Sequence, residues 1–201
     1  MRITFLIVLI SFFGSSQEQV LVLGNVDSFC FTSDSTFVVS DSLPNILDNF
    51  TSVMLFSGSR SNLNEEQIEQ LLIFTNDGGG LYVGAENEPL QAESNQITTK
   101  LYNKVSYGNY SSGTAELASD GNLSFDELEC VPAGISTVAF PLDYRLKVEA
   151  WVEDEPLILS GDLGGGRIVI DGGYSRFYCT NSNEDSDLML DRIIRYLKSP
   201  E

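Results

Sequence analysis

The sequence contains no histidine in its 201 residues. Histidine is the usual general base of Ser-His-Asp and Cys-His sites and the commonest side-chain ligand of transition metals. Its absence excludes these triads and every histidine-ligated metal site. Any catalysis by this chain would therefore depend on carboxylates, tyrosine, lysine, serine or cysteine.

Basic residues are scarce, because 11 Lys and Arg stand against 29 Asp and Glu, for a formal net charge of −18. A surface of this sign repels the phosphates of nucleic acids and the headgroups of anionic lipids. We therefore expect no nucleic-acid partner, whereas cations and basic partners would be attracted. A general role in solubility explains the charge equally well.

Cysteine is also rare, with Cys30, Cys130 and Cys179 as the three thiols. No CxxC pair occurs, which disfavours a thiolate zinc site and a thioredoxin-type motif. We expect one disulfide and one free thiol, and the sequence leaves open which two residues pair. The neighbours of Cys30 and Cys179 are aromatic, acidic or polar, so neither position favours an activated thiolate.

Long apolar runs are absent except at the N-terminus, where residues 3–13 are almost wholly apolar. The preceding Arg2 and the small residue Ser16 complete the pattern of a secretory signal cleaved after Ser16. The run is too short for a membrane-spanning helix, which needs roughly 20 residues. We predict a signal peptide over residues 1–16, a single domain over residues 17–201 without a membrane span, and a secreted, extracellular or periplasmic location.

Three Asn-X-Ser/Thr sequons are candidates for N-linked glycosylation, at Asn49, Asn109 and Asn122. Their modification requires export through a eukaryotic secretory pathway. They are therefore predictions that depend on the signal peptide.

The N-terminal half alternates strand-like and helix-like patterns. Unbroken apolar runs such as Val-Leu-Val-Leu are typical of strands buried on both faces. The second helix has Asn64 as N-cap and Gln67 three residues later, as a capping box requires. We predict strands at residues 19–24, 37–39, 52–56 and 80–84, and helices at 41–50, 64–76 and 91–102.

The C-terminal half is less regular. Residues 107–122 are rich in Gly, Ser and Asn and are predicted to form loops. The last helix has an acidic start and a basic end, which suits the helix dipole. Strands are predicted at residues 136–140, 147–152, 156–160 and 167–170, and a helix at 185–198. The whole pattern predicts an α/β fold, a three-layer sandwich with a mainly parallel central sheet and some added antiparallel strands in this half.

Two glycine triplets, at residues 78–80 and 164–166, precede predicted strands. A phosphate-binding loop instead follows a strand and opens a helix. We therefore predict that both triplets form tight turns.

The turn after the predicted strand at residues 80–84 is the main candidate site. In α/β sheets, ligands collect at the carboxyl ends of strands, and a sharp turn there can carry a nucleophile. Glu86 occupies the position of such a nucleophile and is followed by Asn87 and Glu88. Three interpretations remain open: a structural turn, a ligand or cation contact, and a carboxylate nucleophile or base.

Other strand ends would meet the same edge of a parallel sheet. They carry Asp27, residues 57–60 and residues 171–176. Together with the two glutamates of the turn, Asp27 and Asp171 would form an oxygen-rich site suited to a hard cation. The residues predicted to bind a ligand are Asp27, Glu86, Asn87, Glu88 and Asp171.

The order of these motifs resembles the class I glutamine amidotransferase-like superfamily. The segments that carry the resemblance are Thr75–Pro89 (TNDGGGLYVGAENEP) and Gly164–Tyr178 (GGGRIVIDGGYSRFY), and it spans roughly residues 20–197. The chain is most similar to non-catalytic branches, such as the GIFT-type domains of intraflagellar transport proteins. The resemblance implies a flavodoxin-like, glutamine amidotransferase-like fold.

The resemblance also implies a loss of catalysis. Catalytic members of that superfamily use a Cys at the turn together with a distant His and Glu. Here Glu86 stands in place of the Cys, and the chain has no His. What carries over is the place of a pocket, near Glu86, Asn87 and Asp171.

Two functions are consistent with these observations. The first is a secreted, non-catalytic binding or interaction module without a cofactor, which binds a protein, glycan or small ligand at the strand-end edge. The alternative is a hydrolase-like enzyme that uses Glu86 or Glu88, with or without a divalent cation. Replacing Glu86 by Gln would distinguish them, because an enzyme would lose turnover.

Overall fold

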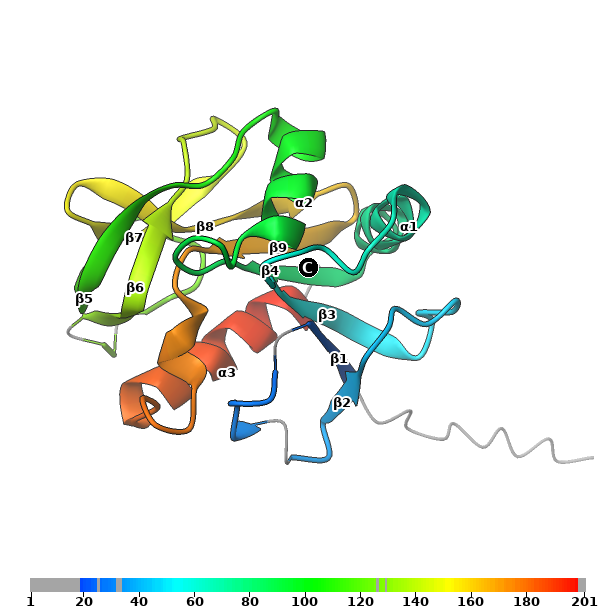
Figure 1. Ribbon diagram of the computed structural model, residues 1–201, viewed down its shortest axis with the longest axis horizontal. Coiled ribbons are helices and arrows are strands. Elements are labelled where there is room, and N and C mark those ends of the chain that lie inside the picture. The colour runs from blue at the N-terminus through cyan, green and yellow to red at the C-terminus, as the bar shows by residue number, and fades with distance from the viewer. Residues whose placement is uncertain (1–18, 25, 32–33, 126, 129, 199–201) are drawn as a thin grey trace, which may run out of the picture.

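The computed structural model describes residues 19–24, 26–31, 34–125, 127–128 and 130–198. In this part of the chain nine strands form one sheet, in the order β2-β1-β3-β4-β9-β8-β7-β5-β6 (Figure 1). The strands are β1 (Gln19–Gly24), β2 (Phe37–Ser40), β3 (Phe50–Phe56), β4 (Gly80–Gly84), β5 (Tyr107–Leu117), β6 (Val131–Ala139), β7 (Lys147–Val152), β8 (Glu155–Leu163) and β9 (Gly166–Asp171). The helices are α1 (Glu65–Asn76), α2 (Ala92–Tyr102), α3 (Glu184–Lys198) and the short 3-10 helix η2 (Tyr174–Phe177).

The sheet is mixed rather than mainly parallel. Strands β2, β1, β3, β4 and β9 run parallel to one another, and every pairing from β9 through β8, β7 and β5 to β6 is antiparallel. The predicted antiparallel additions are therefore present but make up half of the pairings. Two of the antiparallel pairings, β7 with β8 and β8 with β9, join strands linked by short turns, and strands joined by a tight hairpin can only run antiparallel.

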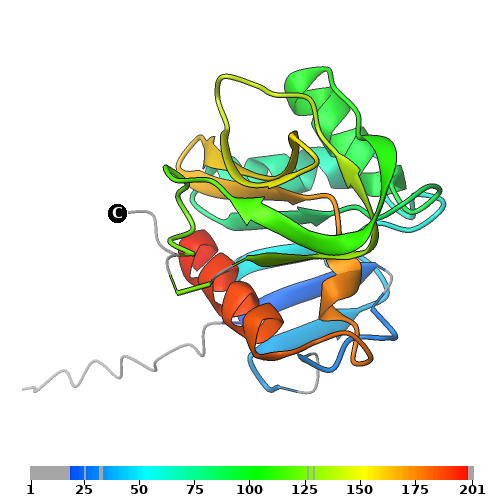
Figure 2. The same ribbon diagram turned by 90° about the vertical axis from the view of Figure 1, so that its left-hand side faces the viewer.

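Helices cover both faces of the sheet. Helices α1 and α2 lie on one face and α3 lies on the other (Figures 1 and 2). Side chains alternate between the faces: on β4, Tyr82 joins the cluster that contains α3, whereas Leu81 and Val83 join the cluster that contains α1 and α2. Burial on both faces explains why these strands read as unbroken apolar runs.

Helix α1 begins as its sequence predicts. The Asn64 side-chain oxygen accepts a hydrogen bond from the Gln67 amide at 2.9 Å, and the Gln67 side chain accepts one from the Asn64 amide at 3.0 Å. These reciprocal bonds satisfy two backbone donors that the first helical turn leaves without partners. The capping box is thus confirmed.

Two predicted elements are wrong. The predicted helix at residues 41–50 is absent: residues 41–49 form an irregular connection that still buries Leu43 and Leu47, and residue 50 begins β3. Pro44 supplies no N–H, and its carbonyl accepts a hydrogen bond from Gln70 of α1 at 2.8 Å instead. Residues predicted as loops form β5, because pairing with β6 outweighs the weak strand preference of Gly, Ser and Asn.

One disulfide links Cys30 and Cys179, with 5.0 Å between their Cα atoms. Among the described cysteines Cys130 is the free thiol. The expectation of one disulfide and one thiol is confirmed, and the structure selects the pair. The predicted signal peptide, residues 1–16, lies outside the described residues. No helix in the described part of the chain is long and apolar enough to cross a membrane.

Replacing Asn64 with Ala should lower the free energy of unfolding by about 1 kcal/mol, because it removes the acceptor for the Gln67 amide. Urea denaturation followed by circular dichroism would measure the change. The control Asn64→Ser keeps a side-chain acceptor and should retain most of the stability. Equal losses in the two variants would contradict the capping role.

Candidate functional site

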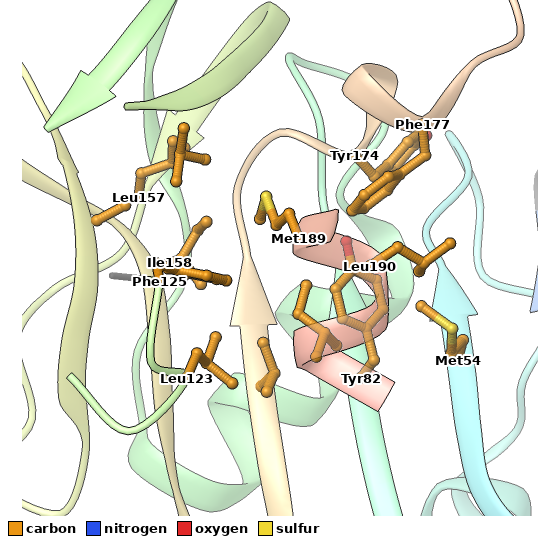
Figure 3. Close-up of a cluster of buried hydrophobic side chains, with 14 of the residues drawn as sticks. Met54, Tyr82, Leu123, Phe125, Leu157, Ile158, Tyr174, Phe177, Met189 and Leu190 are labelled. Carbon is orange, nitrogen blue, oxygen red and sulfur yellow. The ribbon is translucent and has the colours of Figure 1, made fainter. Parts of the chain in front are cut away.

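The carboxyl ends of β4 and β9 lie side by side and carry the candidate turn. Gly84 pairs with Asp171, and the Ala85 amide donates to the Asp171 carbonyl at 2.7 Å. After β9 the chain enters η2, where the Tyr174 phenol donates a hydrogen bond to the Ser57 carbonyl at 2.7 Å. Figure 3 shows Tyr174 and Phe177 of η2 lying together above Tyr82 and Leu190. The end of β9 is therefore locked to β3 and β4.

A buried ion pair joins Asp171 to Arg176 at this edge. Both side chains are fully enclosed, and Arg176 Nη1 donates to Asp171 Oδ2. The same carboxylate accepts from the Tyr82 phenol at 2.7 Å and from the Gly173 amide at 2.9 Å. Arg176 also donates to the carbonyls of Pro132 and Ala133 in β6. One guanidinium thus connects η2, β9 and the far edge of the sheet.

Tyr82 serves this network as a hydrogen-bond donor. Burial, and next the negative charge of Asp171, raise the pKa of Tyr82 well above its usual value. The phenol therefore keeps its proton and donates a hydrogen bond to the carboxylate. A protonated, fully enclosed phenol does not act as a base, so the network holds structure rather than performing chemistry.

Replacing Arg176 with Met should lower the free energy of unfolding by about 3–5 kcal/mol, because it leaves the Asp171 carboxylate enclosed without its partner. Chemical denaturation would measure the loss. The double variant Arg176→Met with Asp171→Asn removes the uncompensated charge and should recover part of it. A double variant as unstable as the sum of the two single variants would contradict this account.

Glu86 occupies the turn after β4 and is only 2 % exposed. Its Oε2 accepts from the Ser175 amide at 2.8 Å, and the Ser175 hydroxyl donates to the same carboxylate. Its Oε1 accepts from the Asn87 amide at 3.3 Å. The carboxylate therefore binds the first turn of η2 to the β4 turn, and backbone donors occupy both of its oxygens.

Burial raises the pKa of the Glu86 carboxyl from 4.5 to about 7, although the donors of Ser175 hold it lower than burial alone would. The folded protein therefore binds this proton more tightly than the unfolded chain does. Stability from this group is complete below pH 4.5, falls as the pH rises through about 7, and is constant above that.

Glu86→Gln should change this pH dependence. The difference in unfolding free energy between the variant and the wild type should shift in favour of the variant by about 3 kcal/mol between pH 4.5 and pH 8. Taking the difference cancels the other carboxylates, and Glu88→Gln, at an exposed neighbour, is the matched control. A difference that does not vary with pH would refute the raised pKa.

The structure does not gather the predicted acidic residues into one site. Asp27 and Glu88 are exposed and Asn87 is half-buried, whereas Glu86 and Asp171 are enclosed and bonded to Ser175 and Arg176 of η2, respectively. Within the described residues, no three Asp, Glu or Cys side chains come close enough together to hold a metal ion. The oxygen-rich cation site proposed from the strand order is therefore not formed by these residues.

An open cavity of about 440 Å³ lies beside the turn instead. It is at the carboxyl ends of β1 and β3, where the chain passes from β1 to β2 on one side and then to β3 on the other. Such a reversal of strand order is where open α/β sheets bind ligands. The cavity is lined by Gly24, Gly58, Ser59, Arg60, Asn62, Leu90 and Glu93.

Gly24 and Glu93 shape this cavity. Gly24 has φ +98°, and a Cβ there would lie 1.9 Å from the Phe56 carbonyl oxygen, so only glycine fits where β1 ends. Glu93 is buried, and its carboxylate accepts from the Gly58 amide at 2.8 Å and the Asn62 amide at 3.1 Å. It therefore fixes the loop after β3 and leaves Arg60 at the cavity wall.

The strand pattern of the sequence predicts residues 57–60 at this edge, but it does not indicate the roles of Glu93 and Tyr82. Glu93 lies on a helix and Tyr82 in mid-strand, so no pattern near the strand ends indicates either one. None of the five residues predicted to bind a ligand lines the cavity. Their assignment as ligand contacts stays a prediction.

The three sequons differ in their surroundings. Asn49 and Asn109 are exposed. Asn122 is half-buried, and its Nδ2 donates to Ser160 Oγ at 2.8 Å. The nitrogen that would carry a glycan is therefore already bonded at Asn122.

No protein-family model matches the sequence, and no curated relative matches it. Solved structures show the fold. A cytoplasmic protein from Salmonella typhimurium, STM3548, has a TM-score of 0.62 at 11 % identity over 90 % of this chain and 100 % of its own. The mmIFT52 N-terminal domain has a TM-score of 0.66 at 10 % identity, over 90 % of this chain and 98 % of its own.

A glutamine amidotransferase from Thermotoga maritima is similar as well, with a TM-score of 0.62 at 13 % identity over 91 % of this chain and 99 % of its own. At these identities the likeness concerns the fold alone. The chain has a glutamine amidotransferase-like α/β fold. The resemblance read from the two glycine-led strands is confirmed to that extent.

The prediction of a secreted, extracellular or periplasmic location is corrected here. STM3548 and a second Salmonella typhimurium protein of similar fold are both described as cytoplasmic, which contradicts it. The Cys30–Cys179 disulfide suits an oxidising compartment but does not by itself show export. We withdraw the prediction of secretion.

Proposed function

We propose that this chain is a non-catalytic glutamine amidotransferase-like domain, of the kind represented by GIFT-type domains, that acts as a binding module. Its binding site is the strand-end cavity lined by Arg60 and Glu93. The observation that carries the proposal is the state of Glu86. The residue at the nucleophile position is enclosed and bonded to Ser175, while an open cavity lies next to it.

The charges of the cavity favour a ligand with a carboxylate. Glu93 is bonded to two backbone amides, whereas Arg60 has no ion pair among the described residues. A guanidinium presents paired donors that match the two oxygens of a carboxylate. The ligand is therefore a small molecule, or a protein side chain, that presents this group to Arg60.

The hydrolase alternative has one observation in its favour, since a carboxyl pKa of about 7 suits a general base. A general base must also reach the proton that it abstracts. Glu86 is 2 % exposed and accepts from Ser175 and Asn87. We therefore prefer binding over hydrolysis.

Titration of the ¹⁵N-labelled protein with L-glutamate tests the proposal. We expect shifts at the amides of residues 58–62 and Glu93, and Arg60→Gln should weaken binding about tenfold, since a charge-assisted pair is lost. Arg195→Gln, which removes the same charge from an exposed position on α3 outside the cavity, should bind as the wild type does. Absence of shifts at these amides, or equal weakening by both variants, would sink the proposal.

An activity assay separates the two functions. We expect no ammonia release from L-glutamine by the wild type or by Glu86→Gln. Turnover by the wild type that Glu86→Gln abolishes would establish the enzyme instead.

A further inference from the structure

A second cavity, of about 420 Å³, lies at the edge of the sheet opposite to the strand-end site. Arg167, which lines the cavity, is near the start of β9, whereas Asp171 at the strand-end edge is the last residue of the same strand. The start of β7, the end of β8 and Tyr196 near the end of α3 complete it. The lining residues that bear on its charge and shape are Asn122, Tyr144, Arg145, Lys147, Asp162 and Arg167.

Positive charge is concentrated in this cavity. Three of the chain's 11 Lys and Arg residues line it, Arg145, Lys147 and Arg167, against Asp162 as the acidic lining residue. In a chain with a net charge of −18, the lining residues of this cavity thus contain more cations than acids. The cavity beside α1, by comparison, is lined by two aspartates, Asp48 and Asp77, and by one cation, Lys198. An excess of cationic lining residues is thus not a general property of the cavities on this surface.

The side chains of Arg145, Arg167 and Lys147 differ in how strongly the protein itself holds them. Arg145 is fixed by Asp143, with Nε donating to Oδ1 at 2.8 Å and Nη2 to Oδ2 at 2.9 Å. Arg167 is held by the Tyr196 carbonyl at 3.0 Å, and the exposed Asp162 carboxylate lies 4.0 Å from its Nε. Lys147 is exposed and forms no ion pair with the described residues. Lys147 is therefore available to a ligand, and Arg167, whose side chain is 21 % exposed, is held in place on the Tyr196 ring at 4.8 Å from its centroid.

A hydrogen-bonded floor supports these cations. Asn122 Nδ2 donates to Ser160 Oγ at 2.8 Å, and Ser160 donates in turn to the buried Glu149. The Glu149 carboxylate also accepts from the amides of Asn122 at 2.7 Å and Leu123 at 3.0 Å. Its negative charge is thus satisfied from the protein side, which reduces its repulsion of an anion in the cavity.

We propose that this cavity binds a tetrahedral oxyanion, the phosphate or sulfate group of a sugar ester. Lys147 and Arg167 face the oxyanion, because an ammonium and a guanidinium are the side chains that bind such groups. Tyr144 lines the mouth with 95 % of its surface exposed, and its ring offers a flat face to the sugar. The site is separate from the strand-end cavity and does not depend on its function.

Titration of the ¹⁵N-labelled protein with glucose 6-phosphate, glucose 6-sulfate and glucose tests this proposal at low ionic strength. We expect either ester to shift the amides of Asn122, Lys147 and Arg167, and the ester that binds identifies the oxyanion. Glucose should shift none of them. Equal shifts with glucose, or no shift with either ester, would overturn the proposal.

Variants locate the site. Lys147→Gln should weaken binding of the ester at least fivefold, and its exposed position should leave the fold intact. Arg192→Gln removes the same charge from α3 outside the cavity, where Arg192 pairs with Glu127, and should change binding less than twofold. Equal weakening by both variants would mean that only net charge matters and would refute a site at Lys147.

Discussion

Arg176 carries a full positive charge into the interior, and the strand-end edge depends on how that charge is satisfied. Asp171 neutralises it, Tyr82 and Gly173 donate to the same carboxylate, and two carbonyls of β6 accept from Nε and Nη2 of Arg176. Removing a charge of this kind from water is costly unless every group finds a partner. The network therefore fixes η2, and η2 in turn supplies Ser175 to Glu86.

This dependence gives Glu86 a structural role. Glu86 points at the backbone of η2 rather than at a substrate, and its raised pKa follows from burial, not from a catalytic partner. An open cavity lined by Arg60 lies beside the turn. At the opposite edge, Lys147 and Arg167 offer a second open cavity of positive charge. The sheet separates the two, so each can be changed without the other.

Much of the fold could be predicted from local patterns. The apolar runs of β1, β3 and β4, the capping box at Asn64 and the polarity of α3 each depend on neighbours within a few residues. The prediction failed where long-range pairing decides, as in β5, whose Gly- and Ser-rich sequence becomes a strand only beside β6. It also failed at residues 41–50, where a helical spacing of apolar residues proved to be a loop that buries Leu43 and Leu47.

The sequence by itself determined what chemistry is absent, because a chain without histidine cannot build the usual triads or histidine metal sites wherever its residues lie. It also determined the strand-helix rhythm, since periodicity is a local property. Only the tertiary structure decided that Cys30 pairs with Cys179, that Asp171 pairs with Arg176, and that Glu86 bonds to Ser175. These outcomes depend on distances between residues far apart in the chain, and those distances are set by the packing of the whole sheet.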